Sequence, residues 1–304
     1  DMPMAVEVMV DMLANSVIEA VEFETERGVI LDELSMGEDD PHTACAESLF
    51  ERIFQGSPLA RPIGGTSDDI RSAQRDAVWE HYQREYSPRQ LVVTAAGGVN
   101  HAQLRDLVER AVAATPWGSA PDSAPVERRH DTQPVVPVVH GGGVALTERP
   151  IEQCTLMLGL PGLALPDTRR ATLSIMNSIL GGGMSSRLFQ EVRERRGLAY
   201  SVYSSAPSYS NAGAFVLAAS CNPANAPEVA ERLWEQFVLL AERGVDEQEI
   251  ARAFGQLSGG AALALEDSDT RMTRLGRAEL MTGEFVDLDA NLNRLARVDR
   301  AQLS

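Results

Sequence analysis

A weak internal repeat constrains the fold of this 304-residue chain more than any single element. The segment EDDPHTACAESLFERIFQG at residues 38–56 resembles EDSDTRMTRLGRAELMTG at residues 266–283 in its acidic start, its helical body and its closing glycine. Each copy is followed by a further helical pattern. Because a repeated supersecondary unit indicates a duplicated architecture, we expect the chain to contain two similar halves.

The apolar patterns predict an α+β fold rather than a doubly wound parallel sheet. Short apolar runs pair locally, while long helical patterns stand apart from them, which is typical of mostly antiparallel sheets packed against helices. We therefore expect two similar α/β-sandwich halves. The longer predicted helices cover residues 5–20, 22–36, 41–54, 76–86, 100–114, 167–180, 226–243, 246–265, 269–281 and 288–303, and the predicted strands cover residues 90–99, 144–148, 153–160, 199–206 and 212–220.

A change of composition divides the chain. Residues 116–138 are rich in Pro, Ala, Ser and Asp and lack apolar periodicity, which predicts a linker. Residues 1–115 are then the remainder of a first domain, and residues 139–304 are a second domain. Comparison of the halves predicts truncation at both ends. The first half lacks counterparts of the elements at residues 144–180, and the second lacks its last strand and helix.

Composition restricts the cellular setting and the partners. The three cysteines are far apart and form no CxxC pair, which favours a reducing, cytoplasmic location over a disulfide framework. No apolar run approaches the length of a membrane span. A net charge of -17 disfavours nucleic acid and anionic membranes and favours cationic peptides. We expect neither a nucleic-acid partner nor a membrane partner.

Two carboxylates in FETERGVILDEL, at residues 23–34, could act together. Glu26 and Glu33 are seven positions apart, so a helix places them on one face about 10 Å apart. Acidic residues on a helix face are usually solvated or paired with arginine, and Arg27 is adjacent. Spacing alone leaves a solvated face and a ligand role open.

Two further segments allow both a structural and a functional interpretation. GGGMSS at residues 181–186 could hold an anion at a helix N-terminus, or form a tight turn with Ser185 or Ser186 as the cap. RERRGLAY places Arg193 and Tyr200 seven positions apart across a glycine helix stop. An arginine at a helix C-terminus is also favourable for purely structural reasons.

Taken in order, several segments resemble the pitrilysin and insulinase family of zinc peptidases. The resemblance is greatest to the processing-peptidase branch, which includes the mitochondrial processing peptidase and its bacterial homologues. It covers almost the whole chain and implies a zinc metallo-endopeptidase that hydrolyses peptides. The segments that carry it are ERGVILDEL, EDDP, RPIGGTSDDI, YSPRQLVVTAAGGV and LGGGMSSRLFQEVRERRGLAYSVYS.

The resemblance assigns roles to four residues. The family binds zinc through an HxxEH motif and a glutamate on a later helix. Glu33 resembles this third ligand, and Glu26 resembles the acidic residue that supports it from behind. Arg193 and Tyr200 resemble the catalytic pair that binds the substrate backbone and stabilises the tetrahedral intermediate. The resemblance also implies a peptide substrate and a dimer, either a homodimer or a pair with another family subunit.

The sequence departs from the family in one respect, because no HxxEH motif occurs in its 304 residues. The chain could come from an active peptidase whose HxxEH segment lies outside these residues. It could instead be a naturally non-catalytic family member that acts as a partner or scaffold subunit, or it could use a new metal site. We expect zinc binding by this chain alone to be weak or absent, and the chain alone to be inactive, because one carboxylate cannot supply a catalytic metal site.

Overall fold

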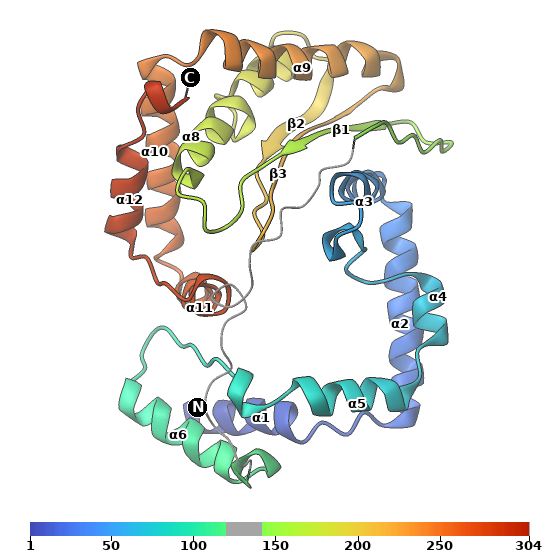
Figure 1. Cartoon of the computed structure of the whole chain (residues 1–304), viewed down its shortest axis with the longest axis vertical. Helices are drawn as coiled ribbons and strands as arrows, with labels where there is room; N and C mark the ends of the chain where they lie inside the picture. The colour runs from blue at the N-terminus through green and yellow to red at the C-terminus, as the bar shows by residue number, and fades with distance from the viewer. Residues whose placement is uncertain (120–141, 304) are drawn as a thin grey trace. The chain divides into compact units, whose positions relative to one another are not determined.

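A computed structural model describes residues 1–119 and 142–303, which form two compact units (Figure 1). Each unit takes most of its residues from one half of the sequence and one segment from the other half. Residues 36–63 belong to the unit built mainly from the second half, and residues 265–285 belong to the other. Unit 1 comprises Asp1–Ser35, Gly64–Gln133 and Leu265–Phe285, and unit 2 comprises Met36–Ile63, Pro134–Ala264 and Val286–Ser304.

Unit 1 consists of helices and has no strand among its described residues. Helix α1 packs along α6 and buries Val6 and Val10. The hydroxyl of Tyr82 in α5 donates to the carbonyl of Leu13 at 2.6 Å. The elements are α1 (Met2–Ala14), most of α2 (Ala20–Asp39), α4 (Ser67–Ser72), α5 (Arg75–Glu85), η2 (Pro88–Gln90), α6 (His101–Ala113), η3 (Pro116–Ser119), α11 (Ser268–Arg277) and η6 (Ala278–Thr282).

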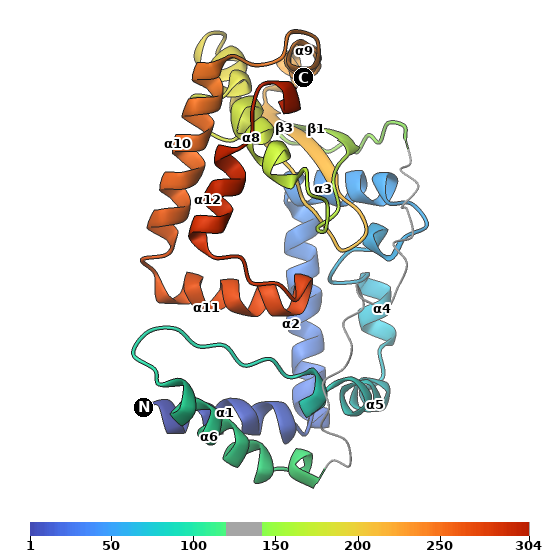
Figure 2. The same ribbon diagram turned by 60° about the vertical axis from the view of Figure 1, so that its left-hand side comes forward.

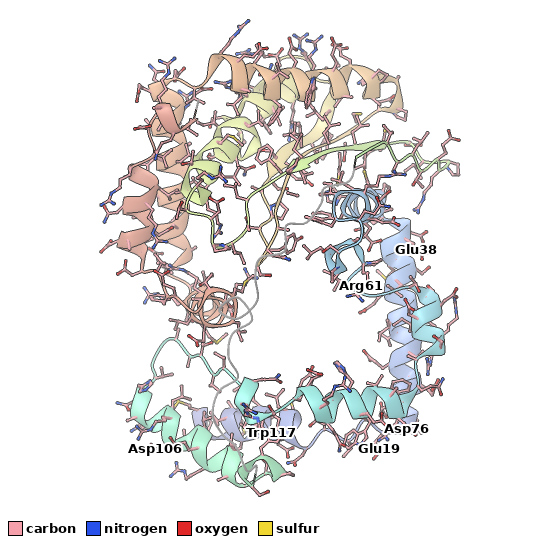
Figure 3. All side chains as sticks on the ribbon, in the orientation of Figure 1. Glu19, Glu38, Arg61, Asp76, Asp106 and Trp117 are labelled. Carbon is pink, nitrogen blue, oxygen red and sulfur yellow. The ribbon has the colours of Figure 1, made fainter. Side chains whose placement is uncertain are left out.

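A side chain of α5 fixes the entry into α2. The guanidinium of Arg75 donates to the carbonyls of Val17 and Ile18, at 2.8 and 2.7 Å. These carbonyls precede the first turn of α2, and Figure 3 labels Glu19 and Asp76 at this corner. The bonds explain why the helix predicted over residues 5–20 ends early, since the chain turns between α1 and α2 and both carbonyls find a donor on α5.

Unit 2 contains a sheet with strand order β1-β3-β2, in which both pairings are antiparallel. Cys154 lies opposite Cys221, and Pro161 lies opposite Ala214. The elements are α3 (Pro41–Ile53), η1 (Pro58–Ala60), β1 (Cys154–Pro161), α8 (Arg170–Gly181), η4 (Phe189–Glu194), β2 (Ala199–Ser205), β3 (Ala214–Cys221), η5 (Pro223–Asn225), α9 (Ala226–Arg243), α10 (Glu247–Ala264), α12 (Leu288–Ala296) and η7 (Ala301–Leu303).

Strand β3 is buried on both faces, which explains its almost continuous apolar sequence. Because successive side chains of a strand point to opposite faces, Phe215 and Leu217 join the cluster formed with α8, α9, α10 and α12. Figures 1 and 2 show α8, α10 and α12 on one side of the sheet and α3 on the other. Val216 joins the opposite cluster, which contains Ile53 and Phe54 at the end of α3. The sheet of unit 2 is therefore covered by helices on both faces.

The two copies of the repeat begin with the same hydrogen bonds. Asp40 accepts from the backbone N–H and the hydroxyl of Thr43, at 2.8 and 2.6 Å. Asp267 accepts from the same two groups of Thr270, both at 2.8 Å. These bonds, the side-chain bond first, lower the pKa of Asp40, and the bonds from Thr270 lower the pKa of Asp267. The capping pattern D-x-x-T thus supports the repeat predicted from the sequence.

The α+β class is confirmed, but two predicted strands are wrong. Residues 90–99 and 144–148 belong to no strand among the described residues. A run of β-forming residues becomes a strand only when another strand pairs with its backbone groups, and neither run finds one there. The predicted strands at 153–160, 199–206 and 212–220 are confirmed as β1, β2 and β3.

The predicted domain division stays a prediction. Most of the predicted linker, from residue 120 onward, lies outside the described residues. Within residues 1–119 and 142–303, no helix combines the length and the apolar character that crossing a bilayer demands.

Candidate functional site

Arg193 lies in a π-helical turn that ends shortly before β2. The turn covers Phe189–Glu194, and within it the backbone N–H of Arg195 donates to the carbonyl of Gln190 at 3.0 Å. Such turns are rare and are frequently found at functional sites. The following Gly197 has a φ of +62°, a left-handed conformation that glycine adopts readily.

Backbone hydrogen bonds reverse the chain after this turn. The N–H of Gly197 donates to the carbonyl of Arg193 at 3.0 Å, and the N–H of Leu198 donates to the carbonyl of Val192 at 2.9 Å. The side-chain amide of Asn225 donates to the carbonyl of Leu198 at 3.1 Å. The path of the chain between the turn and β2 is therefore fixed, and β2 starts at the next residue.

Tyr200 occupies an irregularity in β2. Ala199 lies opposite Cys221 and Ser201 lies opposite Ser220, so Tyr200 has no partner on β3. Such a bulge leaves one residue out of the ladder and can turn its side chain to a new direction, and bulges are common next to active sites. The side chain of Tyr200 is 77% exposed although its neighbour Ala199 is buried. The bulge presents the phenol to solvent.

The structure brings Arg193 and Tyr200 into contact. The guanidinium carbon of Arg193 lies 5.4 Å from the ring centroid of Tyr200 and 4.9 Å from that of Phe189. Both distances are within the range of a cation–π contact. The nearest carboxylate oxygen, from Glu194, is 4.0 Å away. Within the described residues the Arg193 side chain makes no hydrogen bond, so its N–H groups are available to a ligand.

The neighbouring arginines are occupied. Arg196 and Arg195 both donate to Glu191, at 2.8 and 3.1 Å. The bond from Arg196 is the main reason that the pKa of Glu191 is lowered; burial opposes it and the bond from Arg195 adds to it. Of the three arginines in RERR, only Arg193 is not hydrogen-bonded to a carboxylate within the described chain.

The glycine segment before this turn is tightly packed. A Cβ on Gly181 would lie 2.3 Å from the backbone nitrogen of Ser204, a distance that no side chain tolerates. The side chain of Gln256 donates to the carbonyl of Gly182 at 2.8 Å, and Ser186 is buried. This packing supports the interpretation of GGGMSS as a tight turn.

Glu26 and Glu33 lie on α2 and are both exposed. The half-buried side of this helix is formed by other residues, including Phe23, Ile30 and Leu34. Within the described residues, neither carboxylate accepts a hydrogen bond or forms an ion pair. Their position fits a solvated face and a ligand role equally well, and their predicted roles stay predictions.

Arg27 does not neutralise these two carboxylates. It pairs with Glu24 at 2.9 Å, a bond that lowers the pKa of Glu24. It also donates to the carbonyls of Ile70, Arg71 and Ala73 at the end of α4, the last two at 3.2 and 2.8 Å. A cation there complements the negative end of the helix dipole. Its role is to attach α4 to α2.

The described residues do not complete a zinc site. Among residues 1–119 and 142–303, no group of three or more His, Cys, Asp or Glu side chains is close enough to hold a metal ion. Protein zinc sites use at least three such ligands. Glu33 offers a single exposed carboxylate, which is one ligand where such a site needs three.

Two contacts near the sheet were missed by the sequence analysis. The Nε2 atom of His42 on α3 lies 2.5 Å from the hydroxyl of Tyr203 on β2, and burial raises the pKa of Tyr203. Phe189, which contacts Arg193, was also missed. The signal for Phe189 was available, because an aromatic residue four positions before an arginine can reach it on the same helical face.

Comparisons with known proteins agree with this architecture. Residues 72–257 match the family model described as "Peptidase M16 inactive domain". A Streptomyces coelicolor protein described as an uncharacterized zinc protease is 40% identical over 299 residues. The matched region covers 98% of this chain and 64% of that relative, so the chain spans somewhat less than two thirds of its length.

Solved structures show the same fold. A protease from Helicobacter pylori superimposes with a TM-score of 0.86 at 15% identity, covering 99% of this chain and 72% of that one. A chain in the structure of complex III2 from Candida albicans superimposes with a TM-score of 0.80 at 16% identity, with the same coverage of both chains. At these identities the likeness concerns the fold alone.

The fold and the relatives together define the class, which is an α+β protein related to zinc proteases. The chain belongs to the M16 family of peptidases, and this confirms the zinc-peptidase family predicted from its sequence.

Proposed function

We propose that this chain supplies the substrate-binding pair and one metal-binding carboxylate of a zinc metallo-endopeptidase of the processing-peptidase type. The observation that carries the proposal is the contact between Arg193 and Tyr200 in unit 2. The contact joins a cation with available N–H donors to an exposed phenol, and a bulge turns that phenol out of the sheet. The zinc-protease relatives support the metal-dependent class.

The two side chains suit the hydrolysis of a peptide bond. The carbonyl oxygen of a peptide gains negative charge when its carbon becomes tetrahedral, and preorganised donors aimed at that oxygen lower the barrier. The guanidinium of Arg193 and the hydroxyl of Tyr200 are such donors. A zinc ion bound in the complete site would activate the attacking water. The residues of this chain would bind and orient the substrate and stabilise the developing charge.

The proposed class of substrate follows from charge. The chain carries a net charge of -17, which attracts cationic peptides and repels polyanions. We propose arginine-rich or lysine-rich peptides as substrates, and a dimer with a second copy or with a paired family subunit. Light scattering of the purified gene product tests the dimer, and a monomer at micromolar concentration would contradict it.

One experiment on peptide hydrolysis and its zinc dependence tests the proposal. The complete gene product is expected to hydrolyse a cationic fluorogenic peptide, to lose this activity with a chelator and to regain it with zinc. The 304-residue chain alone is expected neither to bind stoichiometric zinc nor to turn over the peptide. Chelator-resistant turnover by the complete product, or zinc-dependent turnover by the isolated chain, would contradict the proposal.

A second candidate is a non-catalytic partner or scaffold subunit. Two observations favour it: the matching family model is described as an inactive domain, and the fold occurs in a chain of the complex III2 structure from Candida albicans. In that case the protein would purify in a stable complex with another chain. The substitutions Arg193→Met and Tyr200→Phe would then leave the peptidase activity of the complex unchanged.

A further inference from the structure

Phe189 touches the proposed substrate-binding arginine and has no assigned role. The centroid of its ring lies 4.9 Å from the guanidinium carbon of Arg193, closer than the ring of Tyr200. Phe189 itself is half-buried and packs against the main core of unit 2. The guanidinium therefore contacts one ring anchored in the core and one ring exposed to solvent.

The backbone explains why this phenylalanine meets the arginine. The π-helical turn has about one residue more per turn than an α-helix, and positions four apart remain on the same side of it. Leu188 and Val192 beside them are fully buried, so the turn is fixed to the core. The position of the Phe189 ring is thus determined by packing rather than by the ligand.

The electrostatic surroundings leave the rings as the main contacts of Arg193. Glu191 is occupied by Arg195 and Arg196, and Glu194 reaches Arg193 only at 4.0 Å. An arginine that stacks on an aromatic face keeps its N–H edges free for a planar acceptor, whereas one bound by a carboxylate uses those edges. Stacking is therefore the arrangement that positions the cation without consuming its donors.

We propose that Phe189 is a positioning residue that orients the guanidinium of Arg193 toward the carbonyl oxygen of a bound peptide. This inference rests on the proposed function, since Arg193 is the group that receives the substrate. Phe189 does not touch the reacting atoms. It limits the directions that an otherwise exposed side chain can take.

The first test does not depend on peptidase activity. Phenylglyoxal modifies accessible arginines, and peptide mapping of the 304-residue chain reports the modification rate of Arg193. Phe189→Met fills the core without a ring and is expected to raise this rate roughly two- to fivefold, the loss expected for one exposed cation–π contact. Phe189→Tyr, which retains a ring, is expected to restore the original rate. An unchanged rate at Arg193 in Phe189→Met would overturn the proposal.

Controls identify a purely structural effect. The modification rates of Arg195 and Arg196 in the same samples should stay constant, because Glu191 holds them. In unit 1, the guanidinium carbon of Arg274 lies 5.7 Å from the ring centroid of Phe285, a similar contact. Phe285→Met changes this contact and should leave the modification rate of Arg193 unaffected. If all three arginines of residues 193–196 become reactive in Phe189→Met, the turn has unfolded and Phe189 only supports the backbone, which also overturns the proposal.

The second test uses the complete gene product. Phe189→Met should raise KM for the peptide roughly two- to fivefold with zinc content unchanged, and Phe189→Tyr should restore KM. An unchanged KM together with a faster modification of Arg193 would show that Phe189 orients the arginine without aiding substrate binding, and would overturn the inference. If the unsubstituted protein hydrolyses no peptide, the proposed function fails, while the modification rates still report whether Phe189 holds Arg193.

Discussion

The two regions that carry the candidate functional residues are built differently. Arg193 and Tyr200 are held together by a π-helical turn, a strand bulge and ring contacts, and they rest on the core of unit 2. Glu26 and Glu33 lie on α2, a helix that buries none of its residues completely. Donors that are already oriented do not have to be reorganised when a ligand binds, whereas carboxylates on an exposed helix need further ligands around them. The chain thus contains one pair of side chains already in contact, Arg193 and Tyr200. It also contains a candidate zinc ligand, Glu33, that belongs to no group of metal ligands among the described residues.

The largest expected effect tests Glu33 as a zinc ligand. Glu33→Gln in the complete gene product should abolish stoichiometric zinc binding and with it hydrolysis, because an amide is a poor zinc ligand and one ligand is lost. Atomic absorption measures the zinc content. Asp32→Asn, an exposed neighbour on another side of α2, serves as the control and should retain zinc. Full zinc content in Glu33→Gln would show that the carboxylate is not a ligand.

A smaller effect is expected at Glu26. If it supports the ligand from behind, Glu26→Gln should weaken zinc affinity by about 10- to 100-fold without abolishing it. Competition with a chromophoric chelator measures this affinity. Equal affinities for Glu26→Gln and the unsubstituted protein would assign Glu26 to the solvated face.

The pair of Arg193 and Tyr200 is tested by Tyr200→Phe, which removes only the hydroxyl. If the hydroxyl stabilises the developing oxyanion, kcat should fall by about 10²- to 10³-fold while zinc content stays constant. Tyr86→Phe changes an exposed phenol of unit 1, which is 50% exposed, and should have no effect. A rate for Tyr200→Phe within twofold of the original would remove the hydroxyl from the mechanism.

A matched pair of substitutions compares side-chain packing in the two units. Phe54 and Met281 occupy corresponding positions after the shared D-x-x-T caps, but Phe54 is fully buried and Met281 is 44% exposed. Phe54→Ala should lower the free energy of unfolding by about 3–5 kcal/mol, and Met281→Ala by less than about 1 kcal/mol. Urea denaturation measures both, and equal losses would contradict the difference in burial.

The smallest effect concerns pH. Burial raises the pKa of Glu249, but hydrogen bonds from Arg187 and from the backbone N–H of Asp246 outweigh it, and the net pKa is below the ordinary 4.5. A lowered folded-state pKa stabilises the fold above the unfolded pKa, and this contribution is lost as pH falls through the folded value. The free energy of unfolding should therefore decrease below about pH 4.5. Glu249→Gln should reduce that decrease, and an unaltered pH profile would contradict it.

Local patterns gave reliable predictions where the determining interactions are local. The caps at Asp40 and Asp267 depend on residues three positions away, so the repeat is visible in the sequence and in the structure. Strand β3 was predicted because its apolar run is long and flanked by turns. The strand at residues 90–99 was predicted on the same grounds and is absent, because strand formation requires a partner that no local pattern reports.

The candidate residues show the same limit of local sequence patterns. Arg193 and Tyr200 were identified through resemblance, but their spacing of seven could not indicate the bulge or the ring contacts. Phe189 was missed because an aromatic residue on a short helix is most often a core residue. Its spacing of four from Arg193 allowed a contact, but only the packed turn shows that the two side chains meet.

The sequence by itself determined the zinc-peptidase family, the α+β class and the internal repeat, and it nominated the candidate residues. These depend on residue types and short spacings, which the chain carries wherever it folds. Only the tertiary structure decided that each copy of the repeat belongs to the unit of the other half, and that Arg193, Tyr200 and Phe189 meet. Such contacts join surfaces whose burial and backbone direction are fixed by the packed core, and spacing along the chain does not by itself determine them.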